Sequence, residues 1–202
     1  MNRSQKVLLL LTSAAVIPVL MASGVQTGKK AEEAVKQDET IASIASYLKE
    51  QSPDIPDEMA RDIASFVYVE SKSHEVDYRL VLAVMKVESN FRLDAVSPKG
   101  ARGLLQIKPS VARDITDTLG EAWHGDGSLH EPQKNIRLGV YHLSTLIDKF
   151  ETLPWALYAY NSGSTRARKL ASTQKTPGLR FAKAVWTEYE KTMTVLPNAA
   201  VE

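Results

Sequence analysis

A glutamate stands where a helix would bury apolar side chains. The stretch "LVLAVMKVESNF", residues 80–91, carries apolar residues at helical spacing. At about 100° per residue, Glu88 falls beside this apolar stripe, next to Val81. A carboxyl group among apolar neighbours favours its neutral form, which raises its pKa, and it can then give a proton to a leaving oxygen. A helix turned by some tens of degrees would instead leave Glu88 at the edge of the stripe, and the spacing alone leaves both interpretations open.

A series of helices must position this residue. No segment shows sustained strand alternation, so the sequence predicts an all-α fold. Asp77 is suited to cap the N-terminus of the helix that carries Glu88. Glu70 also falls on an apolar helix face, and we predict a structural role for it, paired with Lys72 or Arg79. Other helices are predicted to begin near Glu58, after Pro109 with Ser110 as the cap, at Pro154 and at Leu179. A further long helix, lined by Ile136, Val140, Leu143 and Ile147, is predicted to reach Phe150.

The composition excludes several classes of function. The 202 residues suffice for one domain with a sizeable core, and 25 Lys and Arg nearly balance 24 Asp and Glu. A net charge near +1 gives no reason to expect binding to nucleic acid. The lack of cysteine excludes disulfides, a cysteine nucleophile and cysteine-ligated zinc. The four histidines form no i, i+4 pair, so we expect neither a metal site nor another cofactor.

The N-terminal residues have the pattern of an export signal. The basic segment "MNRSQK" precedes the apolar run "VLLLLTSAAVIPVLMA", and small residues follow. We expect residues 1–24 to be a signal peptide or an inner-membrane anchor and residues 25–57 a polar, partly helical spacer. Residues 58–192 are predicted to form the folded domain and residues 193–202 a tail. The protein is therefore expected in the periplasm or elsewhere in the cell envelope.

Four motifs resemble those of one enzyme family. In chain order they are "ESNF", "AVSPKGARGLLQIKPSVA", "NIRLGVYHL" and "AYNSG". Each is weak evidence alone, but the ordered set, over roughly residues 76–172, resembles the lytic transglycosylases with a soluble-lytic-transglycosylase (SLT) domain, relatives of goose-type lysozyme. The resemblance implies a lysozyme-like helical fold and an enzyme that cleaves the glycan strands of peptidoglycan.

The resemblance also implies roles for individual residues. Glu88 stands at the family's only catalytic carboxylate, and Ser89 matches the residue often drawn as hydrogen-bonding to it. "GLLQ" corresponds to Gly-Leu-Met-Gln, with Leu105 in place of the usual Met, a swap that conserves volume. The implied substrate-binding residues are Ser89, Gly103, Leu105, Gln106, Tyr160 and Asn161. Judged without the resemblance, Ser89 could bond the backbone, Gln106 could be a loop amide, Tyr160 could be core and Asn161 could end a helix.

One departure from the family pattern lies near the C-terminus. Family members often carry a Glu-Thr-Arg-x-Tyr run whose tyrosine points at the acid. The corresponding stretch here is "GLRFAKAV", in which Arg180 aligns but Phe181 and Ala182 stand where the tyrosine would be sought. The level of activity, rather than the class of reaction, is what this change puts in question.

The resulting prediction is cleavage of the β-1,4 bond between N-acetylmuramic acid and N-acetylglucosamine. Glu88 would act first as acid and then as base, and the muramyl 6-hydroxyl would close onto C1 to give a 1,6-anhydromuramyl end. One alternative is a lysozyme-like hydrolase that uses a second acid such as Asp94 to activate water. Another is a non-catalytic module that binds or organises glycan. The glycan strands of peptidoglycan are the expected partner in every case. The sequence leaves protein partners open.

Overall fold

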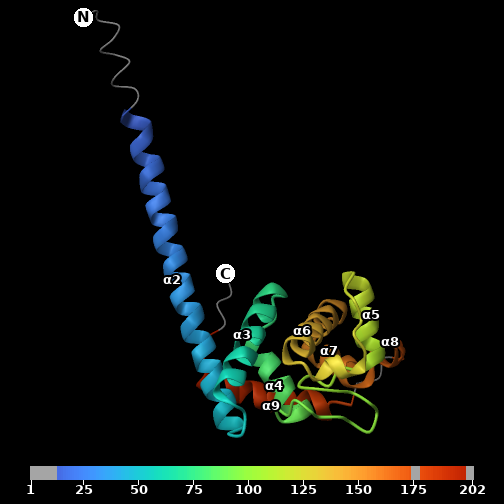
Figure 1. Ribbon diagram of the computed structural model, residues 1–202. Coiled ribbons are helices and arrows are strands. Elements are labelled where there is room, and N and C mark those ends of the chain that lie inside the picture. The colour runs from blue at the N-terminus through green and yellow to red at the C-terminus, as the bar shows by residue number, and fades with distance from the viewer. Residues whose placement is uncertain (1–12, 174–177, 199–202) are drawn as a thin grey trace, which may run out of the picture. The chain divides into compact units, whose positions relative to one another are not determined.

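The computed structural model describes residues 13–173 and 178–198, with side chains from residue 28 onward. The chain divides into two compact units, Met1–Thr40 and Ile41–Glu202. The described part of the first unit is the N-terminal portion of helix α2, Ser13–Gln51 (Figure 1), where Lys29 and Glu33 pair at 3.9 Å. Residues 1–12 of the predicted leader lie outside the described residues. Within residues 13–173 and 178–198, no helix combines the length and the apolar character needed to cross a membrane.

The second unit is built from helices, which confirms the predicted all-α class. Its only extended pairings in the described residues are isolated bridges of Arg102 with Val96 and with Ile107. After α2 the elements are α3 Asp57–Ser73, α4 Tyr78–Ser89, α5 Pro109–Leu119, the 3₁₀ helix η1 Asp126–His130, α6 Pro132–Lys149, α7 Leu153–Ser162, α8 Ser164–Ala171 and α9 Arg180–Val195.

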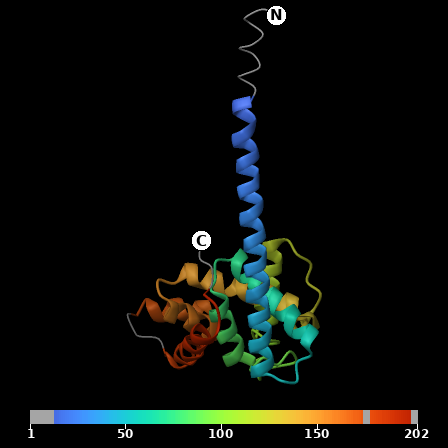
Figure 2. The ribbon, with the colours of Figure 1, turned by 90° about the vertical axis from the view of Figure 1, so that its left-hand side faces the viewer.

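Helix α4 lies at the centre of this unit. Every side chain from Tyr78 to Met85 is buried, because α4 packs against α9 and against α3. Helix α6 in turn packs against α3 and α7. Helix α7 packs against α8 and against α9, and in Figure 2 the orange and red C-terminal part of the chain lies to the left. A helix that is apolar on all sides over two turns must be enclosed in this way, and its last turn carries Glu88.

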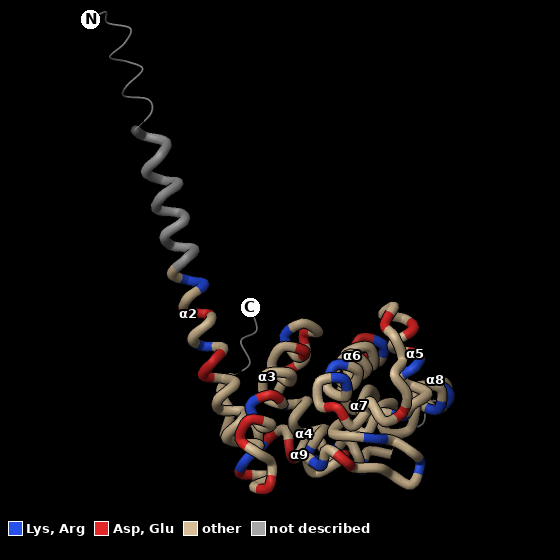
Figure 3. The backbone as a smooth tube through the Cα atoms, in the orientation of Figure 1, with Lys and Arg blue, Asp and Glu red and all other residues tan. Residues whose placement is uncertain are grey.

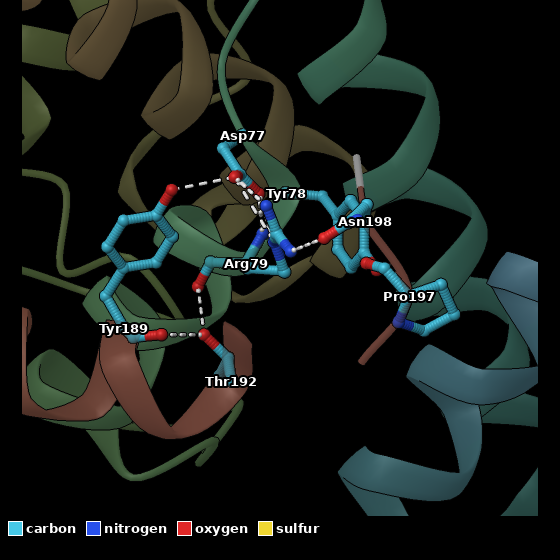
Figure 4. A network of polar contacts seen from close by, with 7 residues as sticks. All are labelled: Asp77, Tyr78, Arg79, Tyr189, Thr192, Pro197 and Asn198. Carbon is cyan, nitrogen blue, oxygen red and sulfur yellow. Dashed lines mark hydrogen bonds and ion pairs between the residues drawn. The ribbon is translucent and has the colours of Figure 1, made fainter. Parts of the chain in front are cut away.

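A polar network fixes the N-terminal end of α4 to the C-terminal part of the chain (Figure 4). The Asp77 carboxylate accepts a hydrogen bond from the Arg79 backbone N–H at 2.9 Å, which confirms the predicted cap. It also accepts bonds from the Arg79 guanidinium at 2.7 Å and from the Tyr189 hydroxyl at 2.7 Å. Burial pushes the pKa of Asp77 up, but these hydrogen bonds outweigh it and the pKa is lowered. Thr192 donates to the Arg79 carbonyl at 3.2 Å, so α4 and α9 are joined through side chains of both helices.

The domain begins earlier and ends later than the sequence predicted. Ile44 and Leu48 are completely buried, and Tyr47 packs edge-on against Phe91 with ring centroids 6.1 Å apart. The compact unit therefore starts at Ile41, inside the segment predicted as a spacer. The apolar residues of "IASIASYLKEQ" form a stripe that faces the core. The polar segment before them led to their assignment to the spacer.

At the other end, Leu196 is buried, the Tyr78 hydroxyl donates to the Pro197 carbonyl, and the Arg79 guanidinium donates to the Asn198 side chain at 3.0 Å. Pro197 and Asn198, in the segment predicted as a tail, are held by the same network that caps α4.

Three local predictions also change. Lys108 occupies the N-cap of α5 and Pro109 its first turn, so Ser110 is not the cap. Helix α8 lies in a segment for which no helix was predicted. Glu70 does have a structural partner, but it is His74 at 3.6 Å, one turn away on the same helix.

Candidate active site

Glu88 occupies the last turn of α4, half-buried beside fully enclosed turns of the same helix. Burial raises the pKa of Glu88 from 4.5 to about 7, since the ionised form has lost part of its hydration. The geometry therefore agrees with the first of the two interpretations of the stripe: the carboxyl group is pressed against the core. A carboxyl group with this pKa is present in both protonation states near neutral pH, as a proton donor and acceptor must be.

The backbone just after Glu88 turns sharply through two residues with positive φ. Asn90 has φ 52° and Phe91 has φ 62°, and a bulky residue such as Phe is rare in this region. Phe91 is held there by burial, with 1% of its surface exposed, and by its contact with Tyr47. The turn ends α4 directly after Ser89, which keeps Glu88 at the end of a rigid element and next to a loop.

Ser89 is buried, and its hydroxyl donates to the Met85 carbonyl at 3.0 Å. This is the backbone-bonding arrangement that the residue type alone suggested. A hydroxyl has one proton, so Ser89 does not donate here to the Glu88 carboxylate, the bond that the family resemblance implies.

The loop of residues 95–107 folds back on itself around Gln106. Gln106 has φ 48°, and its side-chain amide donates to the carbonyls of Ala95 at 3.0 Å and Gly103 at 2.9 Å. Both amide hydrogens are thereby used inside the loop. What Gln106 can offer to a bound sugar is its carboxamide oxygen, a hydrogen-bond acceptor.

Asn135, on α6, fixes this loop by hydrogen bonds to its backbone. The sequence analysis assigned no role to Asn135. Its side chain is 1% exposed. It accepts from the Leu105 backbone N–H at 2.8 Å and donates to the carbonyls of Arg102 at 2.9 Å and Leu129 at 2.8 Å. The Arg102 carbonyl also accepts from the Ile107 backbone N–H at 3.0 Å, so the groups that depend on Asn135 are the Leu105 N–H and the Leu129 carbonyl. The signal was available, because Asn135 is the first residue of "NIRLGVYHL".

Two glycines permit the close approach of the loop to α6. A Cβ on Gly103, which has φ 73°, would lie 2.3 Å from the Leu129 carbonyl oxygen and 2.4 Å from the Asn135 amide nitrogen. A Cβ on Gly139 would lie 2.4 Å from a methyl group of Leu105. Gly103 and Leu105 therefore shape and pack the loop, and Leu105 is buried with 1% of its surface exposed.

Tyr160, on α7, connects the loop with Glu88. Its hydroxyl donates to the Leu105 carbonyl at 2.7 Å. Burial and, second, the negative charge of Glu88 hold the pKa of Tyr160 well above its usual value, so the phenol stays a neutral donor. Tyr160 is thus close enough to Glu88 to feel its charge, and the structure brings together Glu88, Tyr160 and the turn that contains Leu105 and Gln106.

Asn161 follows Tyr160 and is exposed at the C-terminal turn of α7. The helix ends two residues later at Gly163, which has φ 92°, so Asn161 also marks a helix end as the alternative interpretation proposed. In the described part of the chain its side chain takes part in no hydrogen bond that would occupy it.

Two further rings pack against Tyr160. Phe181, at the start of α9, lies nearly parallel to it, with an interplanar angle of 4° and centroids 6.4 Å apart. His142, on α6, lies 5.3 Å away, and burial lowers the pKa of His142 to about 4, with the charge of Lys149 a smaller cause. The imidazole is therefore neutral. Phe181 stands where the family's tyrosine would be sought. It has no hydroxyl to point at Glu88, and it stacks on Tyr160 instead.

The acids other than Glu88 are placed less favourably. Asp94, the alternative second acid, is exposed in the loop after α4, and Glu70 pairs with His74. Among residues 28–173 and 178–198, no group of three or more His, Asp or Glu side chains is arranged to hold a metal ion.

This helical domain, in which the half-buried Glu88 lies near Tyr160, has the all-α, lysozyme-like architecture of the SLT enzymes. Residues 66–180, more than half of the chain, match the family model of the Transglycosylase SLT domain. The chain belongs to this family.

Curated relatives and solved structures agree with that assignment. The chain is 40% identical over 75 residues to the endo-type membrane-bound lytic murein transglycosylase A of Klebsiella pneumoniae, which covers 35% of this chain and 36% of the relative. It is 29% identical over 152 residues to the membrane-bound lytic murein transglycosylase C of Mannheimia succiniciproducens, covering 69% of this chain and 43% of the relative. The chain thus spans well under half the length of these relatives.

Among solved structures, an inactive glutamate-to-glutamine mutant of the lytic transglycosylase Slt from Pseudomonas aeruginosa is 30% identical. It superposes with a TM-score of 0.50 over 66% of this chain and 22% of that one. The 70 kDa soluble lytic transglycosylase from Escherichia coli, 21% identical, superposes with a TM-score of 0.55 over 78% of this chain and 31% of that one, and shows the shared fold.

Proposed function

We propose that this protein is a peptidoglycan lytic transglycosylase in which Glu88 is the single catalytic carboxyl group. The observation that carries the proposal is the burial of Glu88, which raises its pKa to about 7, near Tyr160, whose hydroxyl bonds the loop that contains Gln106. Two comparisons support it: the relatives are named lytic murein transglycosylases, and a glutamate-to-glutamine mutant of the similar Slt enzyme is inactive.

The proposed reaction needs a group that gives and then takes one proton. Protonated Glu88 gives its proton to the glycosidic oxygen as the bond from C1 of N-acetylmuramic acid to N-acetylglucosamine breaks. The resulting carboxylate then removes the proton from the muramyl 6-hydroxyl, whose oxygen forms a bond to C1. The products are a free 4-hydroxyl on N-acetylglucosamine and a 1,6-anhydromuramyl end, and Glu88 regains its proton.

The neighbouring groups would hold the sugar for this step. We assign sugar contacts to the carboxamide oxygen of Gln106 and to the exposed side chain of Asn161. Tyr160, whose hydroxyl is used by Leu105, would act mainly by fixing the loop and by limiting water around Glu88. The 6-hydroxyl is already attached to the reacting sugar, so its proximity replaces a recruited water.

Product analysis tests both the activity and the reaction type. Purified protein is incubated with peptidoglycan sacculi, and the soluble fragments are analysed by mass spectrometry. The expected fragments end in 1,6-anhydromuramic acid, lighter by one water than hydrolytic fragments. Reducing muramyl ends that take up oxygen label from the solvent would show a hydrolase, and Asp94 would then be the first residue to mutate.

Two variants test the role of Glu88. Glu88→Gln keeps the shape but removes the transferable proton, so fragment release should fall by at least about a hundredfold, with glycan binding retained. Glu70→Gln is the matched control, a half-buried glutamate on α3 that pairs with His74, and should stay close to wild type. Near-normal release by Glu88→Gln would refute the assignment.

We also propose that the protein acts in the cell envelope. The export pattern of residues 1–24 and the relatives' description as membrane-bound support this location. A reporter enzyme fused after Thr27 should be active outside the cytoplasm, and activity confined to the cytoplasm would contradict the proposal.

A further inference from the structure

The segment that contains Tyr160, Asn161 and Phe181 carries a local excess of positive charge. Residues 152–187 contain six Lys and Arg and no Asp or Glu, although the two kinds of charge nearly balance in the whole chain. The five of these that the structure describes are all exposed, and none of them has an ion pair within the described residues: Arg166, Arg168, Lys169, Arg180 and Lys183. Figure 3 shows the Lys and Arg of α8 grouped together. Unpaired cations on one segment indicate an anionic partner.

The same segment contains a cavity. It has a volume of about 330 Å³ and lies between α7 and α9, lined mostly by apolar side chains. Lys183 is its one charged lining residue. Trp186, also in the lining, keeps 47% of its surface exposed, which is unusual for so large an apolar side chain.

The Trp186 ring is held in place. Its indole N–H donates to Glu190 at 2.8 Å, and its ring packs edge-on against Tyr189 with centroids 5.8 Å apart. Both partners lie on α9 itself, so the exposed face of the ring is preorganised. An apolar surface that is already fixed loses little conformational entropy when it binds a ligand.

The cavity lining shares helices with residues of the candidate active site. Leu157 in its lining lies one helical turn before Asn161 on the same face of α7. Ala182 in its lining follows Phe181, which stacks on Tyr160. A glycan that contacts Asn161 would therefore lie within one helical turn of the cavity lining.

We propose that the cavity between α7 and α9, with Lys183 and the exposed face of Trp186, binds the peptide stem of peptidoglycan. This rests on the proposed function. The stem is attached to the muramyl lactyl group and combines small methyl side chains of alanine with free carboxylates. The methyl groups fit the apolar lining, and a carboxylate next to the glycan fits Lys183, with Arg180 adding positive charge at the start of the same helix. The site would make stem-bearing glycan the preferred substrate.

The test compares two substrates and two charge reversals. Glycan strands with intact stems and strands stripped of stems by an amidase are digested by wild type, by Lys183→Glu and by Arg168→Glu, a matched control on α8 outside the cavity. Wild type should prefer the stem-bearing strands. Lys183→Glu should lose about tenfold in kcat/KM on stem-bearing strands, the size of one charge-assisted contact, and little on stripped strands. Arg168→Glu should keep the preference.

A binding measurement keeps this test independent of turnover. An N-acetylated alanine–γ-glutamate–diaminopimelate–alanine tetrapeptide is titrated into wild type and into Lys183→Glu by NMR, with the Trp186 indole signal as the reporter. Shifts in wild type that vanish in Lys183→Glu support the site. If wild type cleaves neither substrate, the proposed function fails while the titration still decides the site.

Equal loss on both substrates, or an unchanged preference in Lys183→Glu, would overturn the stem site. So would a Lys183→Glu variant that keeps its stem preference but no longer sediments with vesicles of anionic phospholipid. That result would show that the positive surface serves a membrane.

Discussion

The burial of Glu88 should cost the protein stability at the pH where the residue works. Its pKa is raised from 4.5 to about 7 in the folded state. Below pH 4.5 the carboxyl group is neutral in both the folded and the unfolded chain. As the pH rises towards 7, the unfolded chain loses this proton while the folded one retains it, so the free energy of unfolding falls by about 1.4 kcal/mol per pH unit. Over the whole interval the loss amounts to about 3 kcal/mol.

Glu88→Gln removes this loss, because a glutamine does not ionise. The free energy of unfolding is measured by urea titration at intervals from pH 4.5 to 8.5 for both proteins, and the wild-type value is subtracted at each pH. The difference should rise by about 3 kcal/mol between pH 4.5 and about 7.5 and then level off. Subtraction cancels the other titrating groups, such as Asp77.

The control is Glu151→Gln, at an exposed glutamate between α6 and α7. Its difference from wild type should stay flat, since that side chain stays in water in both states. A flat difference for Glu88→Gln as well would show that Glu88 is solvated in the folded protein. It would remove the physical basis for its role as an acid near neutral pH.

Three further outcomes follow from the same contacts. Activity should fall about tenfold from pH 6 to pH 8 in initial-rate assays, because the proton-donating form of Glu88 is lost above about pH 7; a rate that rises over this range would contradict the acid role. Asn135→Ala should lower the free energy of unfolding by about 2 kcal/mol in urea titrations, since it leaves two buried backbone groups unpaired, the Leu105 N–H and the Leu129 carbonyl. Gly103→Ala should cost several times more than Gly120→Ala, which has a similar φ of 68° but open space around its Cβ; equal costs would mean that φ alone matters.

The sequence predicted most of the helices and their order, though not α8, because apolar spacing and caps are local signals. The Asp77 cap and the stripe that carries Glu88 are both readable within one helix. The start of the domain was not predictable in the same way. Ile44 and Leu48 belong to a stripe only three turns long at the end of a polar segment, and nothing local shows that Phe91 and the core close over it.

The sequence indicated which residues belong to the candidate site, but it did not indicate most of the contacts that these residues make. Glu88 and Tyr160 were named, but the roles of Asn135 and Phe181 depend on partners far away in the sequence. Ser89 shows the same limit: its neighbour in sequence is Glu88, yet its hydroxyl bonds Met85 one turn earlier. A motif gives the residues that occur together, whereas hydrogen-bond partners depend on tertiary packing.

The costs at the site and the contacts that offset them lie in different places. The buried carboxyl group of Glu88 and the positive φ values of Asn90, Phe91 and Gln106 are each unfavourable and lie on the two segments that flank the proposed sugar position. Satisfied polar groups instead secure the far end of α4 at Asp77 and the underside of the loop at Asn135. A strained segment persists only where its surroundings over-determine it. Within the described residues the Glu88 carboxyl group takes part in no hydrogen bond, which leaves it free to exchange a proton with a substrate.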